Sequence, residues 1–64
     1  MGTESAWIDV TVKAETDKAV LLTNGHREAW IPRSQILDNE DDLHKAVATK
    51  VELPLWIAEK AGLV

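Results

Sequence analysis

The chain has 64 residues, with 11 acidic and 7 basic side chains, no cysteine, and three Trp but no Phe or Tyr. A domain of this size buries only about 60% of the surface of its unfolded chain, so its stability margin is small. The lack of cysteine excludes disulfides and thiolate metal sites and indicates a reducing compartment, and no apolar run approaches the roughly 20 residues of a membrane span. We therefore expect one small cytoplasmic β domain over residues 1–64, with residues 1–5 flexible.

Apolar patterning predicts the first two strands. In residues 6–14, Ile8, Val10 and Val12 alternate with polar side chains, which is the period of a half-buried strand. A polar turn over residues 15–18 follows. The short apolar run 19–23 then predicts a second strand that is buried on both faces.

The pair Asn24-Gly25 predicts a hairpin with a two-residue type I′ turn, because both residues tolerate positive φ. The returning strand is expected over residues 26–31, with Trp30 and Ile31 on opposite faces. Pro32 ends it, since proline cannot donate to a strand ladder. Residues 33–36 are expected to form one tight turn that brings Ile36 and Leu37 onto the core.

The second half of the chain predicts a solvated acidic loop, one more strand and a terminal helix. Residues 38–42 hold four of the acids, and alternation resumes over residues 47–53. Pro54 suits the start of a helix over residues 55–61, and Gly62 suits its end. Trp56, Ile57 and Leu63 are expected to fold back onto the sheet. The fold class is mostly β: a small SH3-like barrel or a strongly bent antiparallel sheet of about four to five strands, with a short C-terminal helix.

The sequence offers no constellation for catalysis, and we expect neither an enzyme nor a cofactor. The acids from Asp38 resemble a calcium loop at its first positions, but Leu43 replaces the glycine and Thr49 the final glutamate that such loops need. His26 and His44 are not spaced from a nucleophile in a recognisable arrangement. We therefore expect no metal site.

The Trp residues are the candidates for binding. Without Phe or Tyr, we expect the core to use at least one of them, and Trp30 and Trp56 would pin the third strand and the helix to it. The alternative is that one Trp stays exposed as an anchor for a partner. Such a patch would contain Trp30, Pro32, Arg33 and Gln35. Trp7, opposite the apolar face of the first strand, suits a dimer contact or the cover of a sheet edge.

Two resemblances extend this interpretation. Residues 25–36 resemble the late part of an SH3 domain, where a Gly-led strand runs into an apolar-Pro step and a short 3₁₀ turn. This likeness implies an SH3-like barrel. It argues against recognition of proline-rich peptides, because Gln35 stands where the groove Tyr is expected and no tandem Trp is present.

The second resemblance covers most of the chain. Residues 15–21, 30–36 and 53–63 are similar to a pattern found in small proteins of phages, prophages and bacteria, roughly E-T-x-K-A-I-L, W-I-P-K-S-Q-I and I-P-E-W-L-A-x-x-K-G-L. The similarity implies an accessory role in a mobile genetic element and no particular reaction. Leu55 replaces the usual acid before Trp56, which makes the start of the helix more apolar.

Three functions follow as hypotheses. The first is a non-catalytic module that binds a host or phage protein through the region of Trp30 to Gln35, with inhibition of a host defence system as one form of it. The second is a single-stranded nucleic-acid module that uses Trp30 with Arg27, Arg33 and Lys50, which the net charge disfavours. The third is a small oligomer that sequesters a nucleotide-like ligand between subunits.

Overall fold

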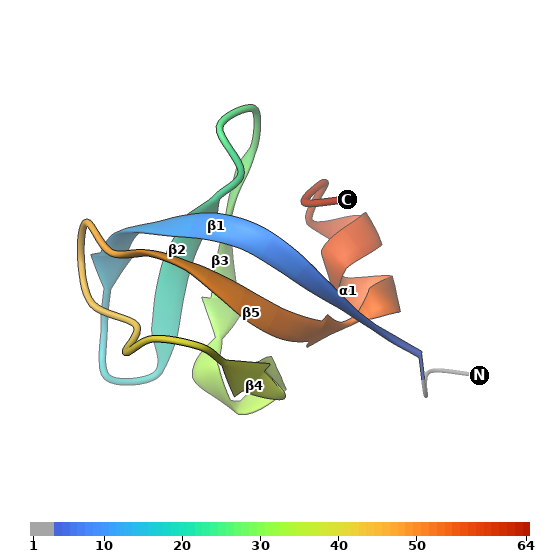
Figure 1. Cartoon of the computed structure of the whole chain (residues 1–64), viewed down its shortest axis with the longest axis horizontal. Coiled ribbons are helices and arrows are strands. Elements are labelled where there is room, and N and C mark those ends of the chain that lie inside the picture. Colours follow the sequence, from blue (N-terminus) through green and yellow to red (C-terminus); the bar gives the residue numbers. More distant parts are fainter. Residues whose placement is uncertain (1–3) are drawn as a thin grey trace.

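A computed structural model describes residues 4–64 and places five strands in one antiparallel sheet, in the order β3-β2-β1-β5-β4 (Figure 1). The single-turn 3₁₀ helix η1 follows β3, and the helix α1 follows β5. The elements are β1 (Ser5–Glu15), β2 (Ala19–Thr23), β3 (Glu28–Pro32), η1 (Arg33–Gln35), β4 (Asp38–Asn39), β5 (Ala48–Pro54) and α1 (Leu55–Lys60). The predicted class, a mostly β fold with a short C-terminal helix, is confirmed.

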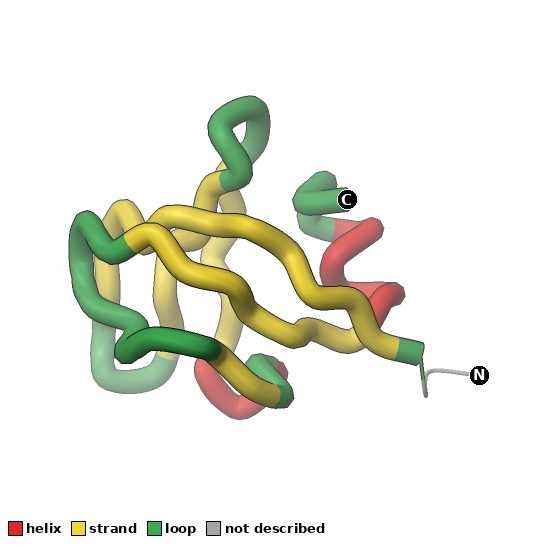
Figure 2. The backbone as a smooth tube through the Cα atoms, viewed as in Figure 1, coloured by secondary structure: helices red, strands yellow, loops and turns green. Residues whose placement is uncertain are grey.

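The long first strand bends the sheet. Its N-terminal part pairs with β5, from Ser5 opposite Pro54 to Thr11 opposite Ala48. Its C-terminal part pairs with β2, and the register shifts between Val12 and Ala14, as at a β-bulge. As a result β1 and β5 cross in front of β2 and β3 (Figures 1 and 2). The arrangement is consistent with a small SH3-like or bent-sheet fold.

Aliphatic side chains fill the space inside the bend. The period-two pattern of β1 and β5 points one set of side chains inward, as predicted, and β2 alternates in the same way. Val12, Val20, Leu22, Val51 and Leu53 are fully buried. The rest of the core is Ile8, Val10, Ile31, Leu43, Ile57, Ala58 and Leu63. None of the three Trp belongs to it, so the prediction that the core uses at least one is wrong. Aliphatic side chains are large enough to fill the core, because the space enclosed by so short a sheet is small.

The β2–β3 hairpin differs from the predicted turn. A type I′ turn needs positive φ at both central residues, and here Gly25 has it (95°) whereas Asn24 does not. Instead, the Asn24 Oδ1 atom accepts hydrogen bonds from the backbone N–H groups of His26 (2.9 Å) and Arg27 (2.8 Å). This side-chain contact stabilises a four-residue loop, so β3 begins at Glu28, two residues later than expected.

Other predictions are corrected at single residues. The strand β2 is not buried on both faces, since Leu21 is half-buried while its neighbours Val20 and Leu22 are inaccessible. Leu37 lies outside the core and is 57% exposed, and its N–H donates to the carbonyl of Glu52 on β5 at 2.8 Å. The acidic stretch contains the two-residue strand β4, which pairs with β5.

The N-terminal segment predicted to be flexible lies partly outside the described residues, which begin at Glu4. The carbonyl of Glu4 accepts a hydrogen bond from the N–H of Leu55 at the start of α1, and Ser5 is the first residue of β1. Within residues 4–64, no helix has the length and apolar character needed to cross a membrane.

Candidate functional site

A groove of about 470 Å³ lies between β3 and α1. We call it the β3–α1 groove; its lining residues are Ala29, Trp30, Ile31, Pro32, Gln35, Trp56, Ile57, Lys60 and Ala61. Most of these side chains are apolar. The two elements that form the groove are separated by more than 20 residues of sequence.

One wall of the groove is the free edge of the sheet. Successive side chains of a strand point to opposite faces, so a hollow over one face touches alternate residues only. The β3–α1 groove touches Ala29, Trp30, Ile31 and Pro32 in succession. It therefore runs along the edge of β3, which is the last strand on its side of the sheet.

The other wall is one face of α1. Helical residues four apart lie on the same side, so Trp56 stands next to Lys60, and Ile57 next to Ala61. Ile57 is 8% exposed and forms the floor together with the half-buried Ala61, whereas Trp56 is 52% exposed at the rim. Packing of Ile57 and Ala58 on the sheet holds the helix in this orientation.

Contacts at the C-terminal end of α1 fix the distance between the two walls. Gly62, with φ of 74°, ends the helix, and its carbonyl accepts a hydrogen bond from the Asn24 side chain at 3.5 Å. The Arg27 side chain packs against Gly62, where a Cβ atom would lie 3.4 Å from the Arg27 Cγ atom. The hairpin loop between β2 and β3 is thus joined to the end of the helix. At the other end of the groove, η1 contributes Gln35.

Both Trp residues of the groove are half-exposed. Trp30 and Trp56 each leave 52% of their surface to solvent. The prediction that they pin the strand and the helix to the core is therefore wrong. Trp30 and Ile31 lie on opposite faces, as predicted, and Trp30 points outward because Ile31 takes the inward position. Trp56 points outward because its neighbours Ile57 and Ala58 occupy the buried face of the helix.

The predicted patch is only partly assembled here. Trp30, Pro32 and Gln35 line the groove, but Arg33 does not. The Arg33 guanidinium turns away, with its Nε atom donating to the carbonyl of Thr16 at 3.0 Å. Trp7 is 49% exposed on the outer side of β1, opposite Glu52, and is not part of the groove.

Sequence reasoning did not place Trp56, Ile57, Lys60 and Ala61 at the site. The signal was present in the spacing of the helix, since Trp56 and Lys60 share one side while Ile57 and Ala58 mark the buried side. What the sequence did not contain was the position of the helix beside β3.

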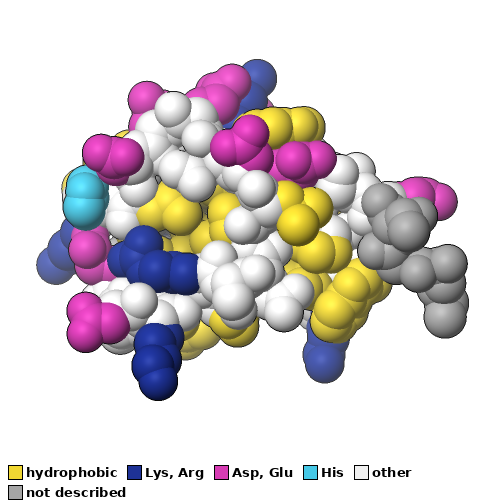
Figure 3. Space-filling model, turned by 90° about the horizontal axis from the view of Figure 1, so that it is seen from below, with side chains coloured by type: hydrophobic (Ala, Val, Ile, Leu, Met, Phe, Trp, Pro, Cys, Tyr) yellow, Lys and Arg dark blue, Asp and Glu magenta, His cyan; other side chains and the backbone are white. Residues whose placement is uncertain are grey.

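Charged groups are concentrated elsewhere. In Figure 3, which looks from the side of η1 and β4, charged side chains mostly gather toward the end opposite α1, and exposed apolar side chains lie toward the α1 end. Lys60 is the one charged residue among those that line the groove. A smaller hollow of about 250 Å³ with mixed lining, including Asp9, Glu40 and Lys50, lies over β1 and β5. Among residues 4–64, no three His, Asp or Glu side chains are grouped as a metal ion would require.

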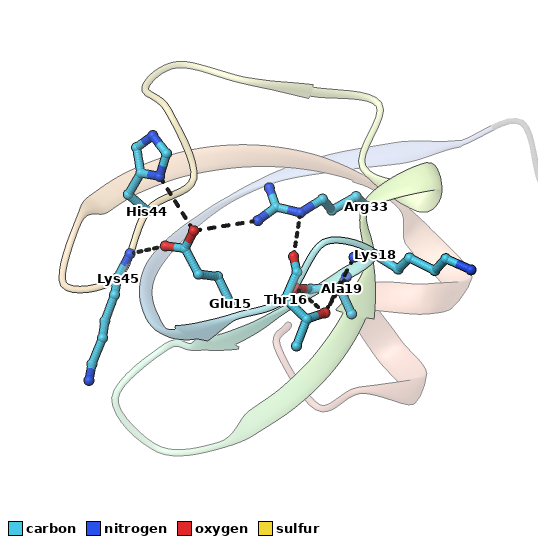
Figure 4. A network of polar contacts seen from close by, with 7 residues as sticks. All are labelled: Glu15, Thr16, Lys18, Ala19, Arg33, His44 and Lys45. Carbon is cyan, nitrogen blue, oxygen red and sulfur yellow. Dashed lines mark hydrogen bonds and ion pairs between the residues drawn. The ribbon is translucent and has the colours of Figure 1, made fainter.

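Glu15 is the centre of the polar network in Figure 4. Its carboxylate accepts a hydrogen bond from the backbone N–H of Lys45 at 2.6 Å and lies 3.5 Å from the Nδ1 atom of His44 and 3.9 Å from Arg33. The hydrogen bond from Lys45, followed by the nearby His44 and Arg33, lowers the pKa of Glu15 below its usual value of 4.5. The network connects the end of β1 with η1 and with the loop before β5. Its partners already satisfy one another, so we assign it a structural role.

Comparison with protein-family models, with curated proteins and with solved structures finds no match to this chain.

Proposed function

We propose that the chain is a non-catalytic binding module that holds a segment of a partner protein in the β3–α1 groove. One observation carries the proposal: two half-exposed Trp side chains, from a strand and a helix far apart in sequence, meet along one apolar groove beside a free sheet edge. Trp residues at the centre of an interface are among the side chains that contribute most to binding energy.

The exposure of these side chains is the supporting energetic argument. A Trp side chain buries on the order of 150–250 Å² when it is covered, and such burial is worth about 25 cal/mol per Å². A chain with few apolar residues to spare leaves half of this surface on Trp30 and Trp56 in water. A partner that covers the groove would recover that free energy.

The charge of the groove bears on the nucleic-acid alternative. A protein that tracks a phosphate backbone needs several cationic side chains along its groove, and the β3–α1 groove contains Lys60 alone. Of the other cations that this hypothesis used, Arg33 is engaged with Thr16 and Glu15, and Lys50 lies at a different hollow. A protein partner fits this composition better.

The ligand-sequestering alternative assumed that a pocket forms only between subunits. The β3–α1 groove lies on one chain, and its volume of about 470 Å³ falls within the range of about 300–1,000 Å³ that small-molecule sites occupy. It is bordered by a strand edge, however, which is a feature that peptide segments use. We therefore keep a peptide segment as the occupant.

The biological setting belongs to the same proposal. The similarity of residues 15–21, 30–36 and 53–63 to small phage, prophage and bacterial proteins supports an accessory module of a mobile genetic element. In that setting, the partner is a cytoplasmic host or phage protein, and one outcome of binding is inhibition of a host defence system.

The test is selection of a displayed library of short random peptides on the protein, followed by titration of the selected peptides into the ¹⁵N-labelled protein. Each of the three Trp carries one indole N–H group, whose signal reports on its own surroundings. We expect the signals of Trp30 and Trp56 to shift while that of Trp7 stays, because only the first two line the groove. Trp30→Ala and Trp56→Ala should each weaken binding at least about tenfold, as interface anchors do.

Trp7→Ala is the matched control, since Trp7 has nearly the same exposure, 49%, at a different place on the sheet. Peptides that shift all three indole signals equally, or that bind Trp7→Ala as weakly as Trp30→Ala, would contradict the proposal. Preferential shifts with a single-stranded oligonucleotide or a mononucleotide would favour the alternatives.

A further inference from the structure

The free edge of β3 runs along the groove, and the ladder with β2 determines which of its backbone groups face away from the sheet. In an antiparallel ladder, hydrogen-bonded and non-hydrogen-bonded pairs alternate. The N–H of Arg33 donates to the carbonyl of Lys18 at 2.8 Å, and the N–H of Asn24 donates to the carbonyl of Arg27 at 3.2 Å. Between these two bonds, the alternation predicts that the backbone N–H and carbonyl groups of Ala29 and Ile31 bond to β2.

By the same alternation, the backbone groups of Glu28, Trp30 and Pro32 face the free edge of the sheet. Two N–H groups, of Glu28 and Trp30, and the carbonyls of all three residues then face away from β2; Pro32 has no N–H. No turn, loop or side-chain hydrogen bond within residues 4–64 uses the backbone groups of Glu28 and Trp30, whereas the Pro32 carbonyl belongs to the N-cap of η1. They lie along the wall of the groove that α1 faces.

A single extended segment fits between these two walls. It would pair with the outward groups of β3 through its backbone and place alternate side chains over the floor of Ile31 and Ile57, between Trp30 and Trp56. This is the mode of recognition in which a peptide adds a strand to a sheet edge. A second copy of the chain is a poorer occupant, because its own β3 edge has its own α1 alongside.

Charge complementarity defines the segment further. The chain has a net charge of −4, yet the charged side chain that lines the groove is the cation Lys60. No carboxylate among residues 4–64 lies within ion-pair distance of it, whereas Lys13 is paired with Glu28, the first residue of β3, at 3.0 Å. A carboxylate on the partner segment would find an unpaired ammonium group at the α1 wall.

We infer that the β3–α1 groove takes an extended segment of a partner protein as an added strand on β3, with apolar side chains at alternate positions and a carboxylate near Lys60. This inference rests on the proposed function and specifies the chemistry of its partner. It assigns the backbone of β3, rather than side chains alone, to recognition.

The experiment uses synthetic peptides of alternating Val and Thr that end in either Asp or Lys, together with the peptides selected from the library. Amide hydrogen exchange of the full chain is measured by NMR with and without each peptide. We expect the exchange of the Glu28 and Trp30 amides to slow at least about tenfold on binding, because they gain hydrogen bonds. The Ala29 and Ile31 amides, already paired with β2, should change little and serve as internal controls.

Two further measurements test the direction and the charge of the segment. N-methylation of alternate peptide residues should abolish binding in one alternating set and leave it in the other, because only one set of N–H groups faces β3. The Asp-ended peptide should bind more tightly than the Lys-ended one, and Lys60→Glu should reverse that order. Lys50→Glu, which makes the same change in net charge on β5, should leave it unchanged.

The outcomes separate this inference from the proposed function. Peptides that shift the indole signals of Trp30 and Trp56 without slowing the Glu28 and Trp30 amides would overturn the added strand and leave the binding module intact. Slowing of these amides with protein concentration, in the absence of peptide, would replace the partner segment with a second copy. If no peptide shifts either indole signal, both proposals fail.

Discussion

The two edges of the sheet are built in opposite ways. The edge strand β4 has two residues, Asp38–Asn39, and is followed at once by Glu40, Asp41 and Asp42. The edge strand β3 has five residues, and its centre is the apolar sequence Ala29-Trp30-Ile31. One sheet therefore ends in a short charged strand on one side and in a longer apolar strand on the other.

The two edge strands differ in how well they are protected against pairing with another strand. Sheets avoid unwanted pairing through short edge strands, charged side chains and proline. All of β4 has this character, whereas β3 has it only at its ends, in Glu28 and Pro32. The middle of β3 is left unprotected beside an apolar groove. The contrast indicates that this edge, and not the other, is suited to a partner.

The largest expected effect comes from proline substitution within β3. Ala29→Pro removes an N–H that the alternation assigns to the β2 ladder, and we expect a loss of about 3 kcal/mol or more in the free energy of unfolding. Glu28→Pro removes an outward N–H and the exposed ion pair with Lys13, and should cost under about 1 kcal/mol. Urea unfolding followed by circular dichroism measures both.

The pair of variants tests which backbone groups of β3 face the groove. If Glu28→Pro destabilises the protein as much as Ala29→Pro does, the assignment of free groups to the edge is wrong, and the two edges of the sheet are not as different as they look.

A smaller effect is expected at the junction of α1 with the hairpin. Gly62→Ala places a side chain at a φ of 74°, which strains the backbone, and sets a Cβ atom against the Arg27 side chain, 3.4 Å from its Cγ atom. We expect a loss of about 1 kcal/mol. Because the contact holds α1 beside β3, peptide binding in the groove should weaken as well.

Gly25→Ala is the matched control, since Gly25 has a φ of 95° and no atom within 4 Å of the added Cβ position. It should lose similar stability without a change in peptide affinity. Equal losses of affinity in the two variants would show that the helix junction does not control the groove.

The sequence predicted most of the sheet because its inward positions follow a simple alternation. β1, β2 and β5 lie close to their predicted ranges, and the inward residues of β1 and β5 are those that the pattern selected. The errors occur where side chains act on the backbone. Asn24 closes the hairpin loop through its own Oδ1 atom, which a dipeptide rule for turns does not capture. The pairing of β4 depends on β5, about ten residues further along the chain.

The groove was harder to predict than the strands. Alternation correctly placed Trp30 and Ile31 on opposite faces, but the expectation that a chain without Phe or Tyr must bury a Trp was wrong. Local patterns show which face of α1 is apolar. They do not show that the side of α1 with Trp56 and Lys60 lies across the groove from the edge of β3. The alternative of an exposed anchor therefore included Trp30 and not Trp56.

The smallest effect that we expect arises from Glu15. It concerns how the two edges of the sheet respond to acid. The backbone N–H of Lys45, with His44 and Arg33 nearby, holds the pKa of Glu15 below its usual 4.5. A lowered pKa means that the fold favours the carboxylate, so this contribution to stability is present above about pH 4.5 and is lost as the pH falls through the lowered value. The loop between β4 and β5 depends on it, because Lys45 lies in that loop.

We therefore expect acid to loosen the β4 side before the β3 side. As the pH falls below 4.5, protection of the Lys45 amide against exchange should decrease while the indole signals of Trp30 and Trp56 stay in place. Glu15→Gln should have the lower protection of Lys45 already at neutral pH and should lose its dependence on acid. If the indole signals move at the same pH as the Lys45 amide, the two edges respond as one unit. The groove would then depend on the charge network after all, in contrast to the independence that the apolar contacts of α1 with the sheet predict.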